Sequence, residues 1–156
     1  MPIVRKPLDL SRVTVVDLAY AAGIIDGEGC LMIARQSYRK GYPENYWPRV
    51  EVGTIDTVLC PWLYETFGGN MYSKDVAYNF KSVPTWKWSV SHAQLYDFLT
   101  AIRPYLKLKA DVADVLLSYR ATIGVPGKNI TEETRAIRRG FYESVKSLRV
   151  KSRKAA

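Results

Sequence analysis

The sequence is poor in the residues that build metal centres and disulfide frameworks. It contains two cysteines, Cys30 and Cys60, too far apart for a CxxC motif, and a single histidine, His92. Two distant cysteines exclude a disulfide-rich secreted scaffold and favour a reducing compartment. One histidine excludes a histidine-rich metal site and leaves His92 as the only histidine that could act as a general base.

Long apolar runs are also missing. No stretch reaches the ~18 apolar residues that a membrane-spanning helix needs. Residues 1–13 are interrupted by prolines and charges, so they lack the apolar centre of a signal peptide. We therefore expect a cytoplasmic or nucleoid-associated protein without a membrane segment.

Acidic residues are outnumbered. The 156 residues include 23 Lys and Arg against 15 Asp and Glu, a net charge of +8. This excess favours a polyanionic partner, although a solvated basic surface without a partner is the alternative. The length suits one domain over 1–156, with a core at about 14–123, a helical extension at about 124–148 and a frayed basic tail at 149–156.

Hydrophobic periodicity predicts an element order that begins α-β-β-α-β-β-α-α and ends with one further helix. Two strands between successive helices indicate an α+β fold with a four-stranded antiparallel sheet covered on one face. Residues 1–13 are predicted to be irregular, and residues 38–48 to form a loop. The predicted helices are 14–26, 58–67, 92–102, 109–123 and 131–148, and the predicted strands are 30–37, 49–54, 70–75 and 84–91.

Alternation along these strands places polar side chains on the uncovered face of the sheet. An amide such as that of Gln36 can pair with adenine, and a guanidinium such as that of Arg49 can pair with guanine. The face could therefore read nucleic acid. The alternative is a solvated antiparallel face, which is polar in any case.

The helix predicted at 14–26 carries small residues at a spacing of four. Ala19, Gly23 and Gly27 share one face, and Ala22 and Asp26 line the adjacent row. Small residues let two backbones approach closely, so the partner would be an identical helix or a neighbouring element. Paired helices would bring two Glu28 carboxylates together, which requires a cation such as Mg²⁺. The alternative is a buried helix with solvated acids at its end.

Residues 21–29, AAGIIDGEG, resemble the motif that names the LAGLIDADG homing endonuclease family. Ala22, Gly23, Ile25, Asp26 and Gly29 match its letters. A second segment, RPYLKLK at 103–109, resembles the family's P-[FY]-L-K-x-K turn before a helix, and the element order resembles the family's core. One motif in a chain of this length implies a homodimer.

The resemblance implies a site-specific double-stranded DNA endonuclease that hydrolyses phosphodiester bonds in a long, near-palindromic target with Mg²⁺ or Mn²⁺. Glu28 would hold the metal with the carbonyl of Gly27. Lys109 would lie near the scissile phosphate, with Lys107 as the alternative, and Thr54 would position water. The arginine that some members carry after the second strand has no counterpart here.

The resemblance and the alternation together predict two further sets of residues. The predicted dimer interface contains Ala19, Ala22, Gly23, Asp26 and Gly27. The predicted DNA contacts are Met32, Ala34, Gln36, Tyr38, Arg39, Lys40, Arg49, Glu51, Tyr72, Lys74, Thr85, Lys87, Ser89 and Lys107.

Two other functions remain open from the sequence. A member that no longer cuts could act as an RNA splicing maturase or a DNA-binding regulator. A basic ribosome-associated or structural RNA-binding protein would explain the charge but not a small-residue helix that ends in acids. Glu28 favours the nuclease, because a protein that only binds needs no acid at the metal position.

Overall fold

The computed structural model describes residues 3–37, 40–74, 85–124 and 129–154. Its elements are strands, α-helices and two short 3₁₀ segments, which are called η1 and η2. They are β1 (Val4–Lys6), α1 (Val15–Gly27), β2 (Gly29–Gln36), β3 (Asn45–Thr54), α2 (Leu59–Phe67), β4 (Gly69–Lys74), β5 (Thr85–Ser91), α3 (Ala93–Ile102), η1 (Arg103–Tyr105), α4 (Ala110–Ser118), η2 (Tyr119–Thr122) and α5 (Glu132–Lys154).

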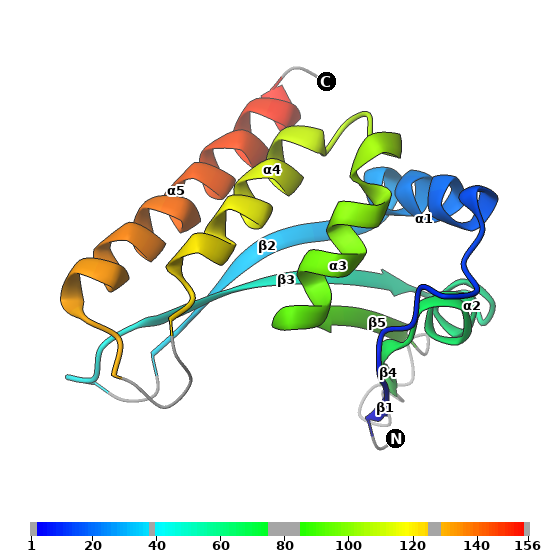
Figure 1. Cartoon of the computed structure of the whole chain (residues 1–156), viewed down its shortest axis with the longest axis horizontal. Coiled ribbons are helices and arrows are strands. Elements are labelled where there is room, and N and C mark those ends of the chain that lie inside the picture. The colour runs from blue at the N-terminus through cyan, green and yellow to red at the C-terminus, as the bar shows by residue number, and fades with distance from the viewer. Residues whose placement is uncertain (1–2, 38–39, 75–84, 125–128, 155–156) are drawn as a thin grey trace, which may run out of the picture.

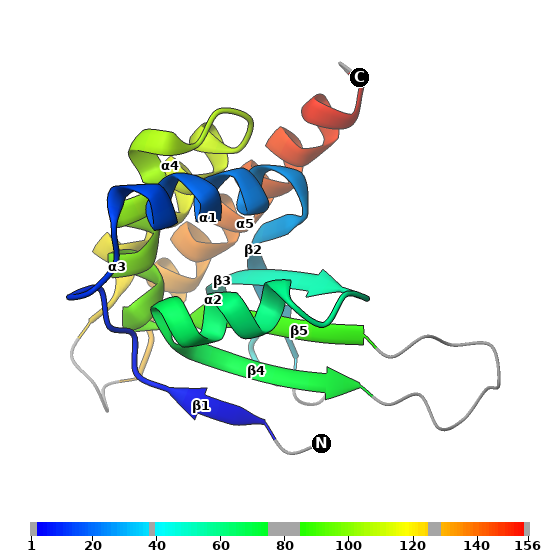
Figure 2. The ribbon, with the colours of Figure 1, turned by 90° about the vertical axis from the view of Figure 1, so that its right-hand side faces the viewer.

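The strands form one antiparallel sheet in the order β1-β4-β5-β3-β2. All five α-helices lie on the same side of this sheet, and its other face, here called the outer face, carries no helix (Figures 1 and 2). The predicted α+β fold with one covered face is therefore confirmed, but the described sheet has five strands and not four. Among the described residues, no helix combines the length and the apolar character needed to cross a bilayer.

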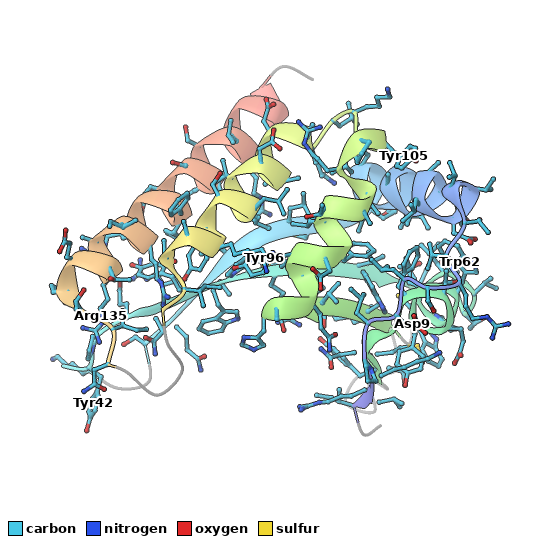
Figure 3. All side chains as sticks on the ribbon, viewed as in Figure 1. Asp9, Tyr42, Trp62, Tyr96, Tyr105 and Arg135 are labelled. Carbon is cyan, nitrogen blue, oxygen red and sulfur yellow. The ribbon has the colours of Figure 1, made fainter. Side chains whose placement is uncertain are left out.

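Aromatic side chains fill the layer between helices and sheet. The ring of Phe98 packs edge-on against Phe67 at 5.4 Å and against Trp88 at 5.2 Å, and all three are buried. The Trp88 indole donates a hydrogen bond to the carbonyl of Gly68 at 2.7 Å, so its polar group is satisfied inside the core. Tyr96 also lies in this layer, whereas Tyr42 is exposed (Figure 3).

The fifth strand comes from the segment that was predicted to be irregular. Leu8 and Leu10 pack against the core, and the backbone of Asp9 donates to the carbonyl of Phe67 at 3.1 Å. Gly68 lets the chain pass, because a Cβ there would lie 2.1 Å from the carbonyl oxygen of Pro7. Tertiary packing, and not local pattern, makes β1 a strand.

Two other predicted boundaries were wrong. Strand β3 starts at Asn45 and includes Pro48, which the sequence had placed in a loop. Proline is tolerated there because β5 pairs with β3 only as far as Arg49, so that, among the described strands, Pro48 is paired with β2 alone. The tail that was predicted to be frayed is helical as far as Lys154, where α5 ends.

Helices α4 and α5 cover the far end of the β2–β3 hairpin (Figure 1). The ring of Tyr142 in α5 packs at a tilt against that of Tyr46 in β3, with centroids 5.5 Å apart, and the Tyr119 hydroxyl donates to the Tyr46 carbonyl. Arg139 donates to the Tyr46 hydroxyl at 3.2 Å. The C-terminal extension therefore braces the hairpin of the same chain from the helix side.

Candidate nucleic-acid interface and metal site

Helix α1 ends where the chain turns directly into the sheet. Thr14 and Asp17 form a capping box at its start, and the Glu28 backbone donates to Ile24 at 2.7 Å at its end. A Cβ on Gly29 would lie 2.7 Å from the Cα of Ile25, so only glycine lets β2 leave this close to the helix. The side chain of Glu28 is exposed at this turn.

The two sequence signatures meet at the end of α1. The Asp26 carboxylate accepts hydrogen bonds from the backbone amides of Lys107 at 2.7 Å and Lys109 at 3.0 Å. The Lys109 ammonium in turn donates to the carbonyls of Ile25 at 2.7 Å and Gly29 at 2.6 Å. Residues 80 positions apart are thus locked to one helix end.

Lys109 is half-buried at the negative end of the α1 dipole, where a cation is favourable. Burial lowers the pKa of the Lys109 ammonium below its ordinary value, and the neighbouring Asp26 carboxylate opposes that shift. An ammonium carries three hydrogens, and two of them are held by the carbonyls. The third hydrogen of this ammonium can be donated to water.

The donor set at this end fits a hard divalent cation only in part. No group of three or more His, Cys, Asp or Glu side chains within the described ranges could hold a metal. Both Asp26 oxygens are already hydrogen-bonded to backbone amides, which leaves Glu28 and the carbonyl of Gly27 as oxygen ligands. A complete site would need oxygen ligands from outside this chain.

One face of α1 is exposed in the single chain. It presents Val16 and Tyr20, which are 76% and 56% exposed, together with Ala19, Gly23 and Gly27. A Cβ added at Gly23 or Gly27 would meet no atom within 4 Å. Nothing within the described part of the chain therefore requires these two residues to be small.

The adjacent row of α1 does not fit the predicted interface. Ala22 is 0% exposed because it packs into the core of its own chain beside Ala21 and Ile25, so its assignment to a dimer interface was wrong. Asp26 is half-buried and holds the turn before α4. Such a structural use of Asp26 at the helix end agrees with the family resemblance.

Thr54 lies at the end of β3, on the same side of the strand as the buried Val50 and Val52. Its hydroxyl donates to the Asp56 carboxylate and accepts from the Asp56 amide at 3.2 Å. Asp56 then accepts from the backbone of Val58 and Leu59 at the start of α2. Thr54 therefore supports the start of α2, a use that the sequence did not predict.

The strand register defines the composition of the outer face. Arg49 and Glu51 of β3 lie opposite Ser91 and Ser89 of β5, and Lys87 lies opposite Tyr72 of β4. Glu51 binds both neighbouring cations, Arg49 at 2.6 Å and Lys87 at 2.7 Å. The hydrogen bond from Lys87 to Glu51 raises the pKa of Lys87 above its ordinary value. Lys87 therefore stays charged at neutral pH.

The remaining predicted contacts vary in accessibility. Gln36, Lys40 and Lys107 are exposed, while Met32, Ala34, Tyr72, Thr85 and Lys87 are partly exposed. Ser89 is only 4% exposed, so neighbouring side chains cover most of it. Lys74 pairs with Thr85 in the register. Tyr38 and Arg39 lie outside the described residues.

Three residues of the outer face were missed by the sequence reasoning. Trp47 shares the face with Arg49, and Asn70 and Arg5 extend the row that Ser89 begins. Trp47 could have been predicted, because the alternation of β3 continues back to Asn45. It was missed because Pro48 was interpreted as part of a loop. Arg5 gives no local signal, since β1 depends on tertiary contacts.

Comparison with known proteins identifies the fold. No family model matches the sequence, and no curated protein matches it either. Among solved structures, the chain is similar to the homing endonuclease I-CvuI in complex with its target (TM-score 0.65, 17% identity), covering 85% of this chain and 82% of the other. It is also similar to the archaeal intron-encoded homing endonuclease I-Vdi141I complexed with DNA (TM-score 0.67, 13% identity, 85% and 84% coverage).

A third structure agrees with these two. The homing endonuclease I-TnaI has a TM-score of 0.56 at 14% identity, and the match covers 86% of this chain and 97% of the other. The chain therefore has the fold of the LAGLIDADG homing endonucleases. The resemblance drawn from its two motifs is confirmed at the level of the fold.

Proposed function

We propose that this chain is a homodimeric, metal-dependent endonuclease that cuts double-stranded DNA at a specific, near-palindromic site. One observation carries the proposal. Helix α1 presents an exposed face whose glycines have no reason in their own chain to be small, and this face ends at the exposed acid Glu28. A second copy packed on that face would bring two Glu28 carboxylates to one place.

The outer face would bind the duplex. It carries guanidinium, ammonium, amide and hydroxyl groups on adjacent strands, and the chain has a net charge of +8. These groups match base edges in the major groove and phosphates beside it. Two similar structures, of I-CvuI and I-Vdi141I, contain DNA, which supports duplex DNA as the ligand.

Glu28 and the carbonyl of Gly27 would hold Mg²⁺ or Mn²⁺ between two copies of the chain. When bound, such a cation activates water and stabilises the charge on a leaving oxygen. The half-buried Lys109 ammonium would donate its third hydrogen to the scissile phosphate or to the attacking water, and its two carbonyl bonds would fix its direction. Asp26 would keep Lys109 in place through the backbone.

A cleavage selection tests this function. Purified protein and its Glu28→Gln variant are incubated with a randomised duplex library and either Mg²⁺ or Mn²⁺, and both cut ends and retained uncut duplexes are sequenced. Both metals are needed, because I-CvuI bound to another target with 2 mM Mg leaves that DNA uncleaved. We expect cuts at one near-palindromic sequence by the wild type, and retention of the same sequence without cuts by Glu28→Gln.

Other outcomes would contradict the proposal in distinct ways. Retention of one duplex without cuts by either protein would identify a DNA-binding derivative. Neither cuts nor retention would redirect the search to RNA, as expected for a maturase or a ribosome-associated protein. Equal cutting by both proteins would show that Glu28 is not a required metal ligand.

A further inference from the structure

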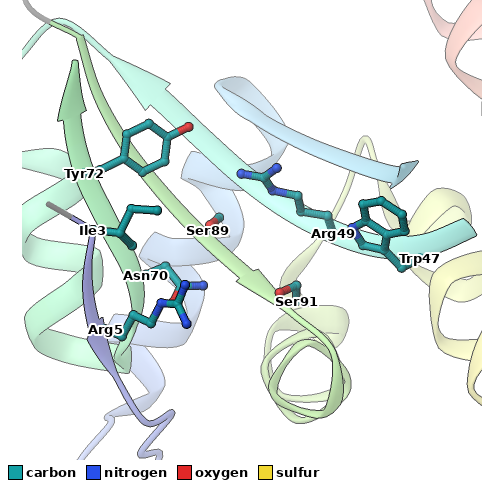
Figure 4. A pocket seen from close by; sticks show the side chains of 8 residues that line it. All are labelled: Ile3, Arg5, Trp47, Arg49, Asn70, Tyr72, Ser89 and Ser91. Atoms are coloured by element: carbon teal, nitrogen blue, oxygen red, sulfur yellow. The ribbon is translucent and has the colours of Figure 1, made fainter. Parts of the chain in front are cut away.

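The outer face contains a hollow that lies at the β1 side of the sheet and not at the end of α1. Its volume is about 150 Å³, and it is lined by Ile3 and by seven residues of β1, β3, β4 and β5 (Figure 4). Arg5 and Asn70 lie on one side, Trp47 and Arg49 on the other, and Ser89 and Ser91 between them (Figure 4). Arg5, on one side of the hollow, therefore comes from β1, the strand that the sequence did not predict.

Strand β1 is held firmly enough to position a side chain. Arg5 pairs with Asn70 in the register, and the following Lys6 ammonium binds the carbonyl and the carboxylate of Glu65 on the helix side, at 3.1 and 3.2 Å. The chain then passes over Gly68, where any side chain would collide with Pro7. Alternation turns Arg5 to the outer face because Lys6 points to the helices.

The two arginines of the hollow differ in their partners. Arg49 is bound to Glu51 at 2.6 Å, whereas no hydrogen bond or ion pair from another described residue occupies the exposed Arg5 guanidinium. Asn70 beside it offers an amide with both donors and an acceptor. An unoccupied guanidinium next to an amide, on a face proposed to bind DNA, can contact a base pair with two parallel hydrogen bonds.

We propose that β1 extends the DNA-reading surface and that Arg5 reads a guanine in each half-site, with Asn70 beside it. This inference rests on the proposed function. A guanine presents two acceptors, O6 and N7, to the major groove, and a guanidinium matches both. Neutral amide and hydroxyl groups line the hollow between the two arginines. Such groups can accept as well as donate hydrogen bonds, which base edges can use and a phosphate, with acceptors only, cannot.

Binding-site selection tests the inference in the Glu28→Gln background, where the duplex stays uncut. Arg5→Ala removes the contact, and Arg5→Lys keeps the charge and the apolar stem while losing the paired geometry. Arg12→Ala is the matched control, because Arg12 is exposed in the turn before α1 and off the sheet. We expect one guanine per half-site whose preference falls about 10-fold or more in both Arg5 variants and stays unchanged in Arg12→Ala.

Each alternative result has a distinct meaning. An equal loss of affinity for all sequences in Arg5→Ala, with full affinity in Arg5→Lys, would identify a phosphate contact and overturn the inference. An unchanged motif in both variants would also overturn it. If the parent with Arg5 intact selects no duplex at all, the proposed function fails and this inference fails with it. Thermal unfolding of each variant verifies that β1 stays docked.

Discussion

The end of α1 and the outer face of the sheet hold their polar groups in opposite ways. At the end of α1, Asp26 and Lys109 are bound to backbone atoms, so their positions follow from the path of the chain. On the outer face, Arg49 and Lys87 are bound by the side chain of Glu51, and no described residue forms a hydrogen bond or an ion pair with the Arg5 guanidinium. We therefore expect the proposed reaction centre at the end of α1 to tolerate little change, and the proposed reading surface to change one residue at a time.

The largest expected effect is at Glu28. Glu28→Gln removes the only free carboxylate among the described residues at the end of α1, so we expect DNA cleavage to fall by at least about 1000-fold. Duplex affinity should change little, because the outer face is untouched. Single-turnover cleavage and fluorescence anisotropy measure the two quantities. Glu133→Gln on exposed α5 is the control and should cleave normally.

The next effect concerns the exposed face of α1. A Cβ at Gly23 meets no described atom from outside its own helix turn within 4 Å, and Gly23→Leu replaces glycine inside a helix, so the monomer should fold with equal or greater stability. Overpacking costs about 1–3 kcal/mol, and a two-fold interface meets the change twice, so self-association should weaken about 100-fold or more. Sedimentation equilibrium measures this.

Gly140→Leu provides the matched control for that experiment. Gly140 lies in α5, and a Cβ there also meets no atom within 4 Å. We expect this variant to self-associate like the wild type. Equal self-association constants in Gly23→Leu and Gly140→Leu would mean that the dimer interface does not lie on the exposed face of α1.

Lys109 should have a smaller effect on cleavage than Glu28. Lys109→Met removes one donor from the reaction centre, so we expect the cleavage rate to fall about 100-fold. Lys107→Met is the control: its amide holds Asp26, but its exposed side chain does not, and its rate should stay within a few-fold of the wild type. A larger loss of cleavage rate in Lys107→Met than in Lys109→Met would mean that Lys107, and not Lys109, is the cation that acts in cleavage.

The pH dependence of cleavage adds an independent measurement at Lys109. Its pKa is lowered by burial, so the ammonium loses its proton at a lower pH than an ordinary lysine. Cleavage that needs this cation should therefore decline as the pH rises through the lowered pKa. In Lys109→Arg the guanidinium stays charged, so the cleavage rate of this variant should be the same at alkaline pH as at neutral pH. An identical alkaline decline in both proteins would assign it to another group.

The smallest expected effect is on the reading surface. Glu51→Gln frees Arg49 and Lys87 to reach phosphates, so non-specific affinity should rise a few-fold and the salt dependence should steepen by about 0.9 for each new phosphate contact. Discrimination between bases should fall, because Arg49 loses its orientation. Competition binding at several salt concentrations measures both. Glu133→Gln makes the same charge change away from the face and should alter neither.

Local patterns predicted the parts of the molecule that local physics determines. The helix that ends at Gly27-Glu28-Gly29 and the alternation of β2 and β5 were readable, because small-residue spacing and period two reflect nearest neighbours. The family motif added Asp26 and Lys109, whose contact joins segments 83 residues apart. Spacing alone could not have paired them.

The features that the sequence did not predict depend on contacts between residues that are far apart in the chain. Strand β1 exists because Gly68 leaves room for Pro7, and neither residue indicates the other in the sequence. A helical wheel places Ala22 beside Gly23, but it cannot tell which of the two rows faces the core of the same chain. Pro48 concealed the first half of β3, because its tolerance depends on where β5 ends.

The central claim is that two copies of the chain form one nuclease around two Glu28 side chains. Native mass spectrometry of the Glu28→Gln protein bound to its selected duplex measures the stoichiometry directly. We expect two chains per duplex, and one chain per duplex for the same protein carrying Gly23→Leu as well. A complex with one chain per duplex, from a wild-type protein that cuts both strands, would contradict the account.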